Sequence, residues 1–395
     1  MKTPVYLDHH ATTPCDPRVV RAMEPWWTED FGNASSATHA FGWRAEAAVE
    51  EAREQLAAAI GASDPREIVF TSGTTESDNL AIAGIARAVR GRRDHLVTSA
   101  IEHPAVLDTC RALASEGFAT TELAVDSGGR VDPEAVREAI AEGTALVTIG
   151  AANGEIGTLQ PLAEIAAVCR EKGVPFHSDA AQAVGKVPLH VEESGVDLLS
   201  FCAHKLYGPK GVGALYVRRG PPRLRLEPLL HGGGHERGLR SGTLPVPLCV
   251  GFARAVALCL ADLESEAERL RGLRERLLAG LRASLSGVET HGDLARRLPG
   301  NLNVSIEGVR TDALLPALPD VALSTGSACA SARGEPSHVL RALGLPPERV
   351  ASALRFGLGR GNDAAQIDAA VARIAEEVAA LRGRATPRPA PPGVG

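Results

Sequence analysis

The first constraint on the fold is an alternation of strand-like and helix-like segments through the first half of the chain. Short apolar runs predict strands at 67–70, 95–99, 145–150, 174–179 and 196–201, and amphipathic stretches between them predict helices at 75–90, 105–115 and 162–172. This alternation predicts an α/β fold with a mostly parallel sheet wrapped by helices. The run at 213–217 follows its predecessor too closely for a helical crossover, so we expect antiparallel pairing there.

The remaining segments predict a second, smaller domain. Helical patterns occur at 45–60, 245–285 and 363–381, with strands near 301–306 and 352–356. We therefore expect four parts: a segment at 1–15 that packs with the small domain, a large domain at 16–244, a small α+β domain at 245–382, and a disordered Pro-rich tail at 383–395.

Charge and cysteine content limit the partners and the compartment. The net charge is −6 and the basic residues are scattered, which argues against nucleic acid or an anionic membrane as the main partner. The N-terminus lacks the apolar core of a signal peptide, and no apolar run approaches the ~20 residues needed to cross a bilayer. Seven cysteines without a CxxC pair are typical of free thiols in a reducing compartment. We expect a cytoplasmic protein.

Two candidate binding elements follow predicted strands, where ligands of parallel sheets bind. The stretch "TSGTTESDN" at 71–79 places small hydroxyl residues at the start of a helix, where free N–H groups and the helix dipole favour a phosphate. An ordinary N-cap is the alternative for this stretch. Asp179 ends another strand and could hold a protonated ring nitrogen, although it could equally cap a helix.

A histidine and a lysine follow two further strands. His103 alone is more commonly structural than catalytic, and most lysines are solvated surface residues. However, burial at the end of an apolar strand would lower the pKa of Lys205 and favour a Schiff base with an aldehyde. A phosphate cradle, an acid for a ring nitrogen, a histidine and an amine together meet the needs of pyridoxal 5′-phosphate (PLP).

Longer motifs resemble those of one enzyme family. The stretches "AHKLYGPKGVGALYVRR" and "GGGHERGLRSGT" are similar to those of the cysteine desulfurases, which are fold-type I PLP enzymes of the class V aminotransferase family. The resemblance runs from "YLDHHATTP" at 6–14 to "LRFGLGR" at 354–360, essentially the whole chain before its tail. It implies a seven-stranded, mostly parallel sheet in the large domain and a two-fold homodimer.

The resemblance implies a role for each matching residue. Lys205 would join the cofactor aldehyde, and His103 would stack on the ring. The other cofactor-binding residues that it implies are Thr74, Thr75, Asn153, Asp179, Gln182, Cys202, His204 and, reaching the neighbouring subunit's phosphate, Thr243. Within this set Asp179 would pair with the ring nitrogen and Gln182 with the phenolic oxygen. The substrate carboxylate would be bound by Arg355, near Asn33, in a pocket lined by Ala11 and Thr12.

Two positions depart from the family pattern. Cys202 stands where the family usually has a serine that binds phosphate, and Gly154 replaces the second Asn of "NNEIG", whose side chain normally lies near the ring oxygen. We expect PLP to bind nonetheless, because the other contacts remain.

His231 and His235 are spaced like zinc ligands, but the three glycines between them argue against a helix, so we expect no metal site.

The segment "STGSACAS" at 324–331 resembles the persulfide-forming loop of group I, the iron–sulfur-cluster-assembly type, with Cys329 as the nucleophile. A small buried cysteine is the alternative. The implied reaction converts L-cysteine to L-alanine and a persulfide on Cys329, which passes to a sulfur acceptor such as an iron–sulfur scaffold or a thiolation enzyme. A selenocysteine lyase or an aminotransferase is a rival interpretation. A catalytically weak sulfur-delivery scaffold is another, supported only by Gly154 and Cys202.

Overall fold

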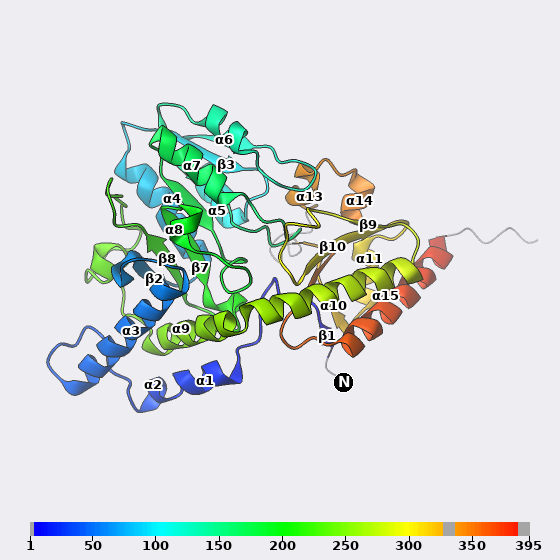
Figure 1. The fold of residues 1–395 in the computed structure, drawn as a ribbon, viewed down its shortest axis with the longest axis horizontal. Coiled ribbons are helices and arrows are strands. Elements are labelled where there is room, and N and C mark those ends of the chain that lie inside the picture. Colours follow the sequence, from blue (N-terminus) through cyan, green and yellow to red (C-terminus); the bar gives the residue numbers. More distant parts are fainter. Residues whose placement is uncertain (1–3, 327–335, 386–395) are drawn as a thin grey trace, which may run out of the picture.

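The computed structural model describes residues 4–326 and 336–385, which form a large and a small lobe. Figure 1 shows the large lobe around one sheet on the left, the small lobe on the right, and a long helical run that joins them. That run consists of α9 (Val246–Ala261) and α10 (Leu263–Ser284). The predicted α/β architecture is confirmed.

The large lobe is built on a seven-stranded sheet in the order β2-β8-β7-β6-β5-β3-β4. Its strands are β2 (Ile68–Thr71), β3 (His95–Ser99), β4 (Ala119–Leu123), β5 (Thr144–Thr148), β6 (Phe176–Asp179), β7 (Leu198–Cys202) and β8 (Gly213–Val217). β8 pairs antiparallel with both β2 and β7, as its short connection predicts, and all other neighbours are parallel.

One strand of this sheet was not predicted from the sequence pattern. β4, with the sequence ATTEL, lies at the edge of the sheet and pairs with β3 only. Its residues are mostly partly exposed, because one side of an edge strand faces solvent. A polar edge strand lacks the apolar run that marks the buried strands, which is why composition did not reveal it.

Helices cover both faces of the sheet, and successive strand residues serve the two sides. Along β2, Val69 packs in a core formed with α4 (Thr74–Ala88) and α5 (Pro104–Ala114). Phe70 faces the opposite core, which contains α3 (Ala40–Ala59), α7 (Leu162–Lys172) and α9. This alternation follows from the two-residue period of a strand.

Shorter helices in the large lobe are α1 (Pro17–Met23), α2 (Pro25–Thr28), α6 (Pro133–Ala139) and α8 (Val191–Ser194), with 3-10 turns η1 (Pro65–Glu67), η2 (Ala203–Lys205) and η3 (Glu236–Gly238).

The packing of α9 places the lobe boundary later than the expected position between residues 244 and 245. Cys249, Phe252 and Val256 of α9 are buried in the same core as α3 and the central sheet. The chain then bends at Asp262, and Leu277 and Leu281 of α10 enter the core of the small lobe. The sequence pattern showed one long helical stretch, and the position of the bend was not visible in it.

The small lobe holds a three-stranded antiparallel sheet in the order β12-β10-β9, against which α10 and α15 lie side by side (Figure 1). Its elements are β9 (Val288–Thr290), β10 (Asn301–Ile306), α11 (Thr311–Leu314), η4 (Leu315–Ala317), α13 (His338–Ala342), α14 (Pro347–Ala351), β12 (Ala353–Gly357) and α15 (Ala364–Ala385). α15 extends two residues beyond the expected start of the tail at 383, and residues 386–395 lie outside the described part of the chain.

The N-terminal segment links the two lobes. β1 (Val5–Tyr6) pairs in parallel with β11 (Val321–Ala322), and Leu7 is buried in the small-lobe core. Beyond this point the chain crosses to the large lobe, where the backbone N–H of Thr13 donates to the carbonyl of His204. The segment between these anchors therefore passes the carboxyl ends of β6 and β7.

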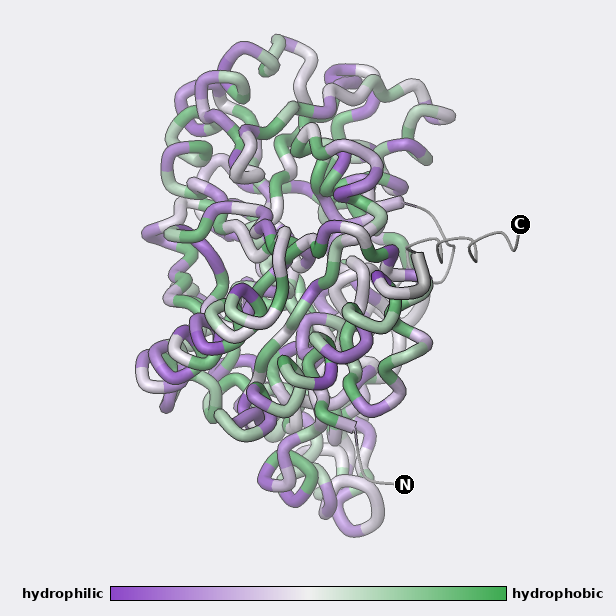
Figure 2. Tube along the Cα trace, turned by 90° about the vertical axis from the view of Figure 1, so that its right-hand side faces the viewer, coloured by the Kyte–Doolittle hydropathy of each residue, from purple (hydrophilic) through white to green (hydrophobic). Residues whose placement is uncertain are grey.

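Hydropathy follows these layers. Figure 2 shows apolar stretches concentrated within the molecule and polar stretches along its outer loops and helices. No single helix in residues 4–326 or 336–385 is long and apolar enough to cross a bilayer. α9 and α10 together reach that length and composition across a 72° bend, but α9 is mostly buried in the large-lobe core.

Candidate active site

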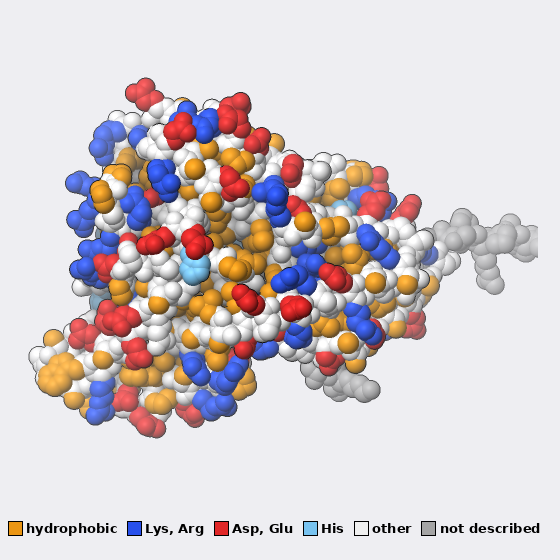
Figure 3. Space-filling model, in the orientation of Figure 1, with side chains coloured by type: hydrophobic (Ala, Val, Ile, Leu, Met, Phe, Trp, Pro, Cys, Tyr) orange, Lys and Arg blue, Asp and Glu red, His pale blue; other side chains and the backbone are white. Residues whose placement is uncertain are grey.

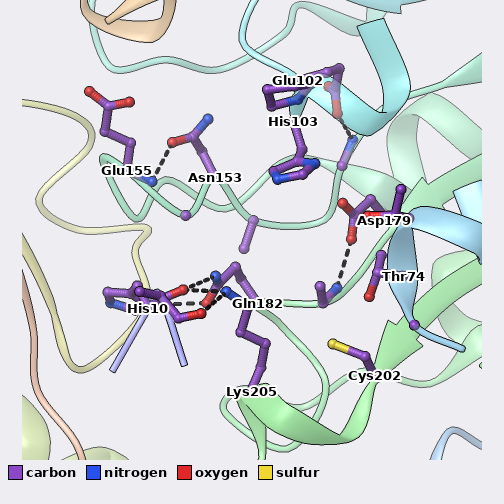
Figure 4. A pocket seen from close by; sticks show the side chains of 18 of the residues that line it. His10, Thr74, Glu102, His103, Asn153, Glu155, Asp179, Gln182, Cys202 and Lys205 are labelled. Carbon is purple, nitrogen blue, oxygen red and sulfur yellow. Dashed lines mark hydrogen bonds between the residues drawn. The ribbon is translucent and has the colours of Figure 1, made fainter. Parts of the chain in front are cut away.

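A cavity of about 580 Å³ lies at the carboxyl ends of the parallel strands, where the two lobes meet. Its walls come from the loop before α4, the ends of β6 and β7, the crossing segment at 10–12, the loop after β5, and Arg355 of β12. Figure 4 shows these side chains converging from several elements on one space. A cavity of this size is in the range of small-molecule and cofactor sites.

The start of α4 forms one end of the cavity. Gly73 precedes the helix with φ 157°, and no side chain caps the first turn. The hydroxyl of Thr74 is buried and, apart from a contact with the Cys202 thiol, has no hydrogen-bond partner among the described residues; the first N–H groups of a helix also have no partner within it. The alternative of a side-chain N-cap is therefore wrong here. The turn presents unpaired donors to the cavity, as a phosphate requires.

Close backbone packing holds this turn in place. A Cβ atom at Gly213 would lie 2.7 Å from the Cα of Gly73, so β8 can approach the turn only with glycine at that position. Glu76, in the first turn of α4, accepts from the N–H of Ser72 at 2.7 Å and from Arg240 Nε at 2.8 Å. The carboxylate thus ties the turn before α4 to the loop that carries Arg240.

Asp179 lies at the end of β6 and lines the same cavity as the α4 turn. Its Oδ1 accepts from the N–H of Ala181 at 2.8 Å and caps the following turn, but α8 begins only at Val191, so Asp179 does not cap a helix as the alternative interpretation expected. Burial raises the pKa of Asp179, and the neighbouring His103 opposes this shift. Such a carboxylate is stabilised when a cationic group lies against it, which is what a protonated ring nitrogen provides.

Lys205 occupies the floor of the cavity, at the end of the 3-10 turn η2 that follows β7. Its Nζ donates to the carbonyl oxygens of His10 at 2.5 Å and Ala11 at 2.7 Å. Burial lowers the pKa of Lys205, which brings its amine closer to the neutral, nucleophilic form. The two carbonyls hold the amine at the side of the cavity where His10 and Gln182 lie (Figure 4).

His103 is the N-cap residue of α5 and lines the cavity. Its Nδ1 accepts from the N–H of Ala105 at 3.1 Å, which caps the helix and leaves the ring proton on Nε2 in the neutral form. Burial lowers the pKa of His103 and favours this neutral form. The histidine thus has both the structural role of a cap and a position from which its ring reaches the cavity (Figure 4).

The buried guanidinium of Arg355 lies on the side of the cavity that the small lobe forms. Arg355 Nη2 donates to Asp8 Oδ1 at 2.7 Å, and its Nη1 lies 3.3 Å from the carbonyl oxygen of Gly154. The Nε of Arg355 is buried without a partner in the described chain. A planar guanidinium with a donor to spare suits a substrate carboxylate.

The arrangement fits PLP on three independent contacts. The α4 turn offers unpaired donors for the phosphate, Asp179 offers a carboxylate for the ring nitrogen, and Lys205 offers an amine for the aldehyde. Bound in this way, the cofactor supplies an electron sink for bonds at the substrate Cα.

The structure brings most of the predicted site residues to this cavity. Those that line it are Ala11, Thr12, Thr74, Thr75, His103, Asn153, Asp179, Gln182, Cys202, His204, Lys205 and Arg355. Asn33 and Thr243 do not line it within the single chain. The Asn33 side chain accepts from the N–H of Ser35 at 2.9 Å, and Thr243 is exposed. Cys329 lies outside the described residues.

Two predicted cofactor contacts have local partners that limit their roles. Asn153 Oδ1 accepts from the N–H groups of Glu155 and Ile156, and its Nδ2 donates to Ile101 at 2.8 Å, so this side chain mainly shapes its own loop. Cys202 is fully buried at the end of β7, and burial raises the pKa of its thiol. A neutral thiol is a weaker phosphate partner than the serine usual at this position.

Sequence reasoning missed three groups at this site. Asp8, which anchors Arg355, lies two residues before His10 in a stretch noted only for its alanine and threonine. Glu102 is buried beside His103 and accepts from Ser99 Oγ at 2.6 Å; burial raises its pKa to about 8. Glu155 is buried with an unpartnered Oε1, and burial raises its pKa to about 7. An acid next to a candidate residue in the sequence is the signal that could have found Glu102.

The fold and this site define a PLP-dependent enzyme of the α/β class. The chain belongs to the class-V aminotransferase family, whose model matches residues 5–370. It is 54% identical over 382 residues to the protein named cysteine desulfurase IscS from Anaeromyxobacter sp. (strain Fw109-5), across 97% of this chain and 94% of that protein.

Solved structures agree with the sequence relatives. One described as a NifS-like protein is similar with a TM-score of 0.89 and 38% identity, across 95% of this chain and all of that one (100%). Another, SspA in complex with cysteine, has a TM-score of 0.80 and 39% identity, across 89% of this chain and 98% of that one. The membership in a fold-type I PLP family that the sequence motifs implied is confirmed.

Proposed function

We propose that the chain is a PLP-dependent cysteine desulfurase that converts L-cysteine to L-alanine and leaves a persulfide on Cys329. The observation that carries this proposal is the placement of the Lys205 amine between the α4 phosphate turn and the buried Arg355 guanidinium, all lining one cavity. The extensive identity to cysteine desulfurases and the likeness to a structure that holds cysteine support the substrate.

Different residues of the cavity bind L-cysteine and move its protons. Arg355 binds the substrate carboxylate through its free donor and orients the Cα above the cavity floor. Lys205 would hold the cofactor through its aldehyde, and its amine, when free, is placed to move the substrate Cα proton. The Nε2 of His103 faces the cavity and manages the proton of the substrate thiol. The carbonyls of His10 and Ala11 hold the released amine close by.

The sulfur step requires a second thiol. Cys329 attacks the substrate sulfur as a thiolate; an S–S bond forms while the substrate Cβ–S bond breaks. The carbon fragment keeps the electron pair of that bond, gains a proton and leaves as alanine. One cysteine and one enzyme thiol thus give one alanine and one enzyme persulfide, with no external oxidant. The persulfide then passes to a sulfur-acceptor protein, such as an iron–sulfur scaffold or a thiolation enzyme.

A homodimer is part of the proposal. Trp27, Phe31, Phe41 and Trp43 are each more than 40% exposed, and Figure 3 shows apolar side chains gathered at the end of the molecule that α2 and the start of α3 form. Asn33 lies within this same apolar region, and both it and Thr243 lie away from the cavity of their own chain. Apolar patches of this kind mark association surfaces. A second copy that covers this end could bring both residues to a shared site.

We also propose a cytoplasmic location. The six cysteines within the described ranges are all free, which suits a reducing compartment. The net charge of −6 does not favour nucleic acid as a partner.

Selenocysteine lyase or aminotransferase activity is not favoured, because the relatives with high identity are named cysteine desulfurases. A weak scaffold role has no support beyond Gly154 and Cys202.

The decisive experiment replaces the nucleophile. Cys329→Ala should abolish alanine and sulfide release from L-cysteine in the presence of a reductant, while the visible absorbance of bound PLP remains. Cys15→Ala, at a partly exposed cysteine in the large lobe, serves as the matched control and should keep normal turnover. Unchanged alanine release by Cys329→Ala would remove the sulfur-transfer role of this residue.

A further inference from the structure

The side-chain amide of Gln182 is held in a single orientation. Its Nε2 donates to the carbonyl oxygen of His10 at 2.9 Å, and a carbonyl oxygen can only accept. Its Oε1 lies 2.7 Å from Lys186 Nζ and 3.1 Å from His10 Nδ1. Turning the amide over would place oxygen against oxygen, so these contacts together exclude the alternative orientation.

Lys186 approaches this amide from the side away from the main cavity. It lines a separate small cavity of about 50 Å³ between the lobes, together with His9, Cys259 and Arg360. Burial, and secondarily the charge of Lys205, lowers the pKa of Lys186 to about 7. An amine can donate to Oε1 in either protonation state, so the contact with Gln182 persists through neutral pH.

His10 supports the same orientation. Burial lowers the pKa of His10 well below its ordinary value, so the ring is neutral and carries one proton. The Nε2 of the ring is buried and has no partner in the described chain, whereas Nδ1 faces Gln182 Oε1. The proton therefore belongs on Nδ1, where it donates to the same oxygen as Lys186.

The chemistry of PLP determines which group faces this amide. The ring hydroxyl and the phosphate arm flank the aldehyde on opposite sides. With the phosphate at the α4 turn, the nitrogen at Asp179 and the aldehyde at Lys205, the ring oxygen lies toward Gln182 (Figure 4). The second N–H of Gln182 Nε2 is the donor on this side.

Neighbouring side chains do not replace that donor. Gly154 has no side chain, and a Cβ atom there would lie 3.1 Å from Gln182 Nε2. The Asn153 side chain is held against its own loop, because one N–H of its Nδ2 donates to the carbonyl of Ile101 and its Oδ1 accepts from Glu155 and Ile156. The orientation of one amide therefore decides whether the ring oxygen meets an N–H donor or a carbonyl oxygen.

We propose that Lys186 is a positioning residue that fixes the amide of Gln182 with its N–H toward the ring oxygen of bound PLP. Without the amine, the amide loses the shortest of its three contacts and is held only by the carbonyl and the ring of His10, so its orientation is less firmly fixed. Lys186 acts entirely through Gln182 and does not touch the cofactor. The inference rests on the PLP site alone and is independent of the sulfur acceptor and of Cys329.

A double-substitution cycle tests this dependence. PLP affinity is measured on the apoenzyme for wild type, Lys186→Met, Gln182→Ala and the double variant. We expect Lys186→Met and Gln182→Ala each to weaken binding about tenfold, the effect of one hydrogen bond to a polar ligand group. In the double variant, loss of Lys186 should add less than a factor of two. Additive losses would overturn the proposal, and so would wild-type affinity in Lys186→Met.

Two further measurements separate positioning from general destabilisation. The absorbance spectrum of bound PLP in Lys186→Met should match that of Gln182→Ala, and Lys186→Arg, which keeps a donor, should restore the wild-type spectrum. Lys172→Met, at an exposed lysine of α7, is the matched control and should change neither quantity. Should Lys186→Met not fold, Lys186→Ala, which also removes the donor, takes its place in the cycle. A wild-type spectrum in a folded Lys186 variant without a donor at Gln182 Oε1 would contradict the proposal.

Discussion

Arg355, on β12 of the small lobe, donates its Nη2 to Oδ1 of Asp8 at 2.7 Å, in the segment that crosses between the lobes. Ser324 Oγ donates to the same oxygen at 3.3 Å, and Asp8 bridges in parallel to Gly357. Among the described residues, the carboxylate that pairs with this guanidinium belongs to Asp8, on the N-terminal segment and outside the large domain. Both lobes and the N-terminal segment are thus needed to hold the cation at the cavity.

Replacing Arg355 with lysine should weaken substrate binding without disturbing the cofactor. A lysine keeps the charge but loses the planar fork, so it cannot bind Asp8 and a carboxylate through separate fixed donors. We expect the KM for L-cysteine to rise about tenfold or more, the effect of losing one charge-assisted hydrogen bond. Arg341→Lys, at an exposed residue of α13, is the control and should leave the KM unchanged. An unchanged KM in Arg355→Lys would show that another residue binds the carboxylate.

The two roles of His103 can be separated by substitution. Asparagine is a good N-cap, so His103→Asn preserves the start of α5 but removes the imidazole from the cavity. We expect kcat to fall by about 10²–10⁴, the usual contribution of a general acid or base, with little change in the melting temperature. His103→Ala should lose activity to the same extent and melt at a lower temperature. Equal kcat values for wild type and His103→Asn would show that His103 only caps the helix and takes no part in catalysis.

Because the pKa of the buried acid Glu155 is raised, we expect the stability of the protein to depend on pH. Burial raises its pKa from 4.5 to about 7, so the folded state disfavours the carboxylate. The unfolding free energy should therefore be unaffected below pH 4.5 and fall as the pH rises toward 7, by up to about 3 kcal/mol. Glu155→Gln should remove this fall, so its melting temperature relative to wild type should increase between pH 5 and pH 8. Glu164→Gln, at an exposed site on α7, should show no such trend.

A buried ion pair anchors the glycine-rich loop at 231–238. Arg53 of α3 makes two hydrogen bonds of 2.8 Å to the carboxylate of Glu236, and Oε2 of that carboxylate also accepts from the N–H of Phe70. Glu236→Gln removes the buried carboxylate from this pair and leaves Arg53 with the half-exposed Glu50 as its charged partner; breaking a buried pair typically costs about 3–5 kcal/mol. Chemical denaturation should show this loss, and the exposed pair of Arg276 and Asp368 offers the control through Asp368→Asn, with little change.

The sequence was sufficient where a single local pattern determined the outcome. The apolar runs that became β2, β3, β5, β6 and β7 gave the parallel sheet, and the short link to β8 gave its antiparallel pairing. Lys205, Asp179 and Thr74 could be found because residues that end parallel strands meet at one edge of the sheet.

The rest depended on contacts between distant parts of the chain. Nothing local distinguishes the bend at Asp262, because both α9 and α10 are helical, and only their packing against different cores separates them. The pairing of Asp8 with Arg355 joins residues 347 positions apart in the sequence. Likewise, Lys186 follows Gln182 by four residues, but only the fold shows that its amine turns back onto the amide.

The most direct test of the whole account is to locate the covalent bond to the cofactor. The PLP-saturated enzyme is reduced with borohydride, digested and mapped by mass spectrometry. The account predicts one pyridoxyl-modified peptide, with the modification on Lys205 and none on Lys186 or Lys210. A modification on a different lysine, or no modified peptide from enzyme that contains PLP, would contradict it.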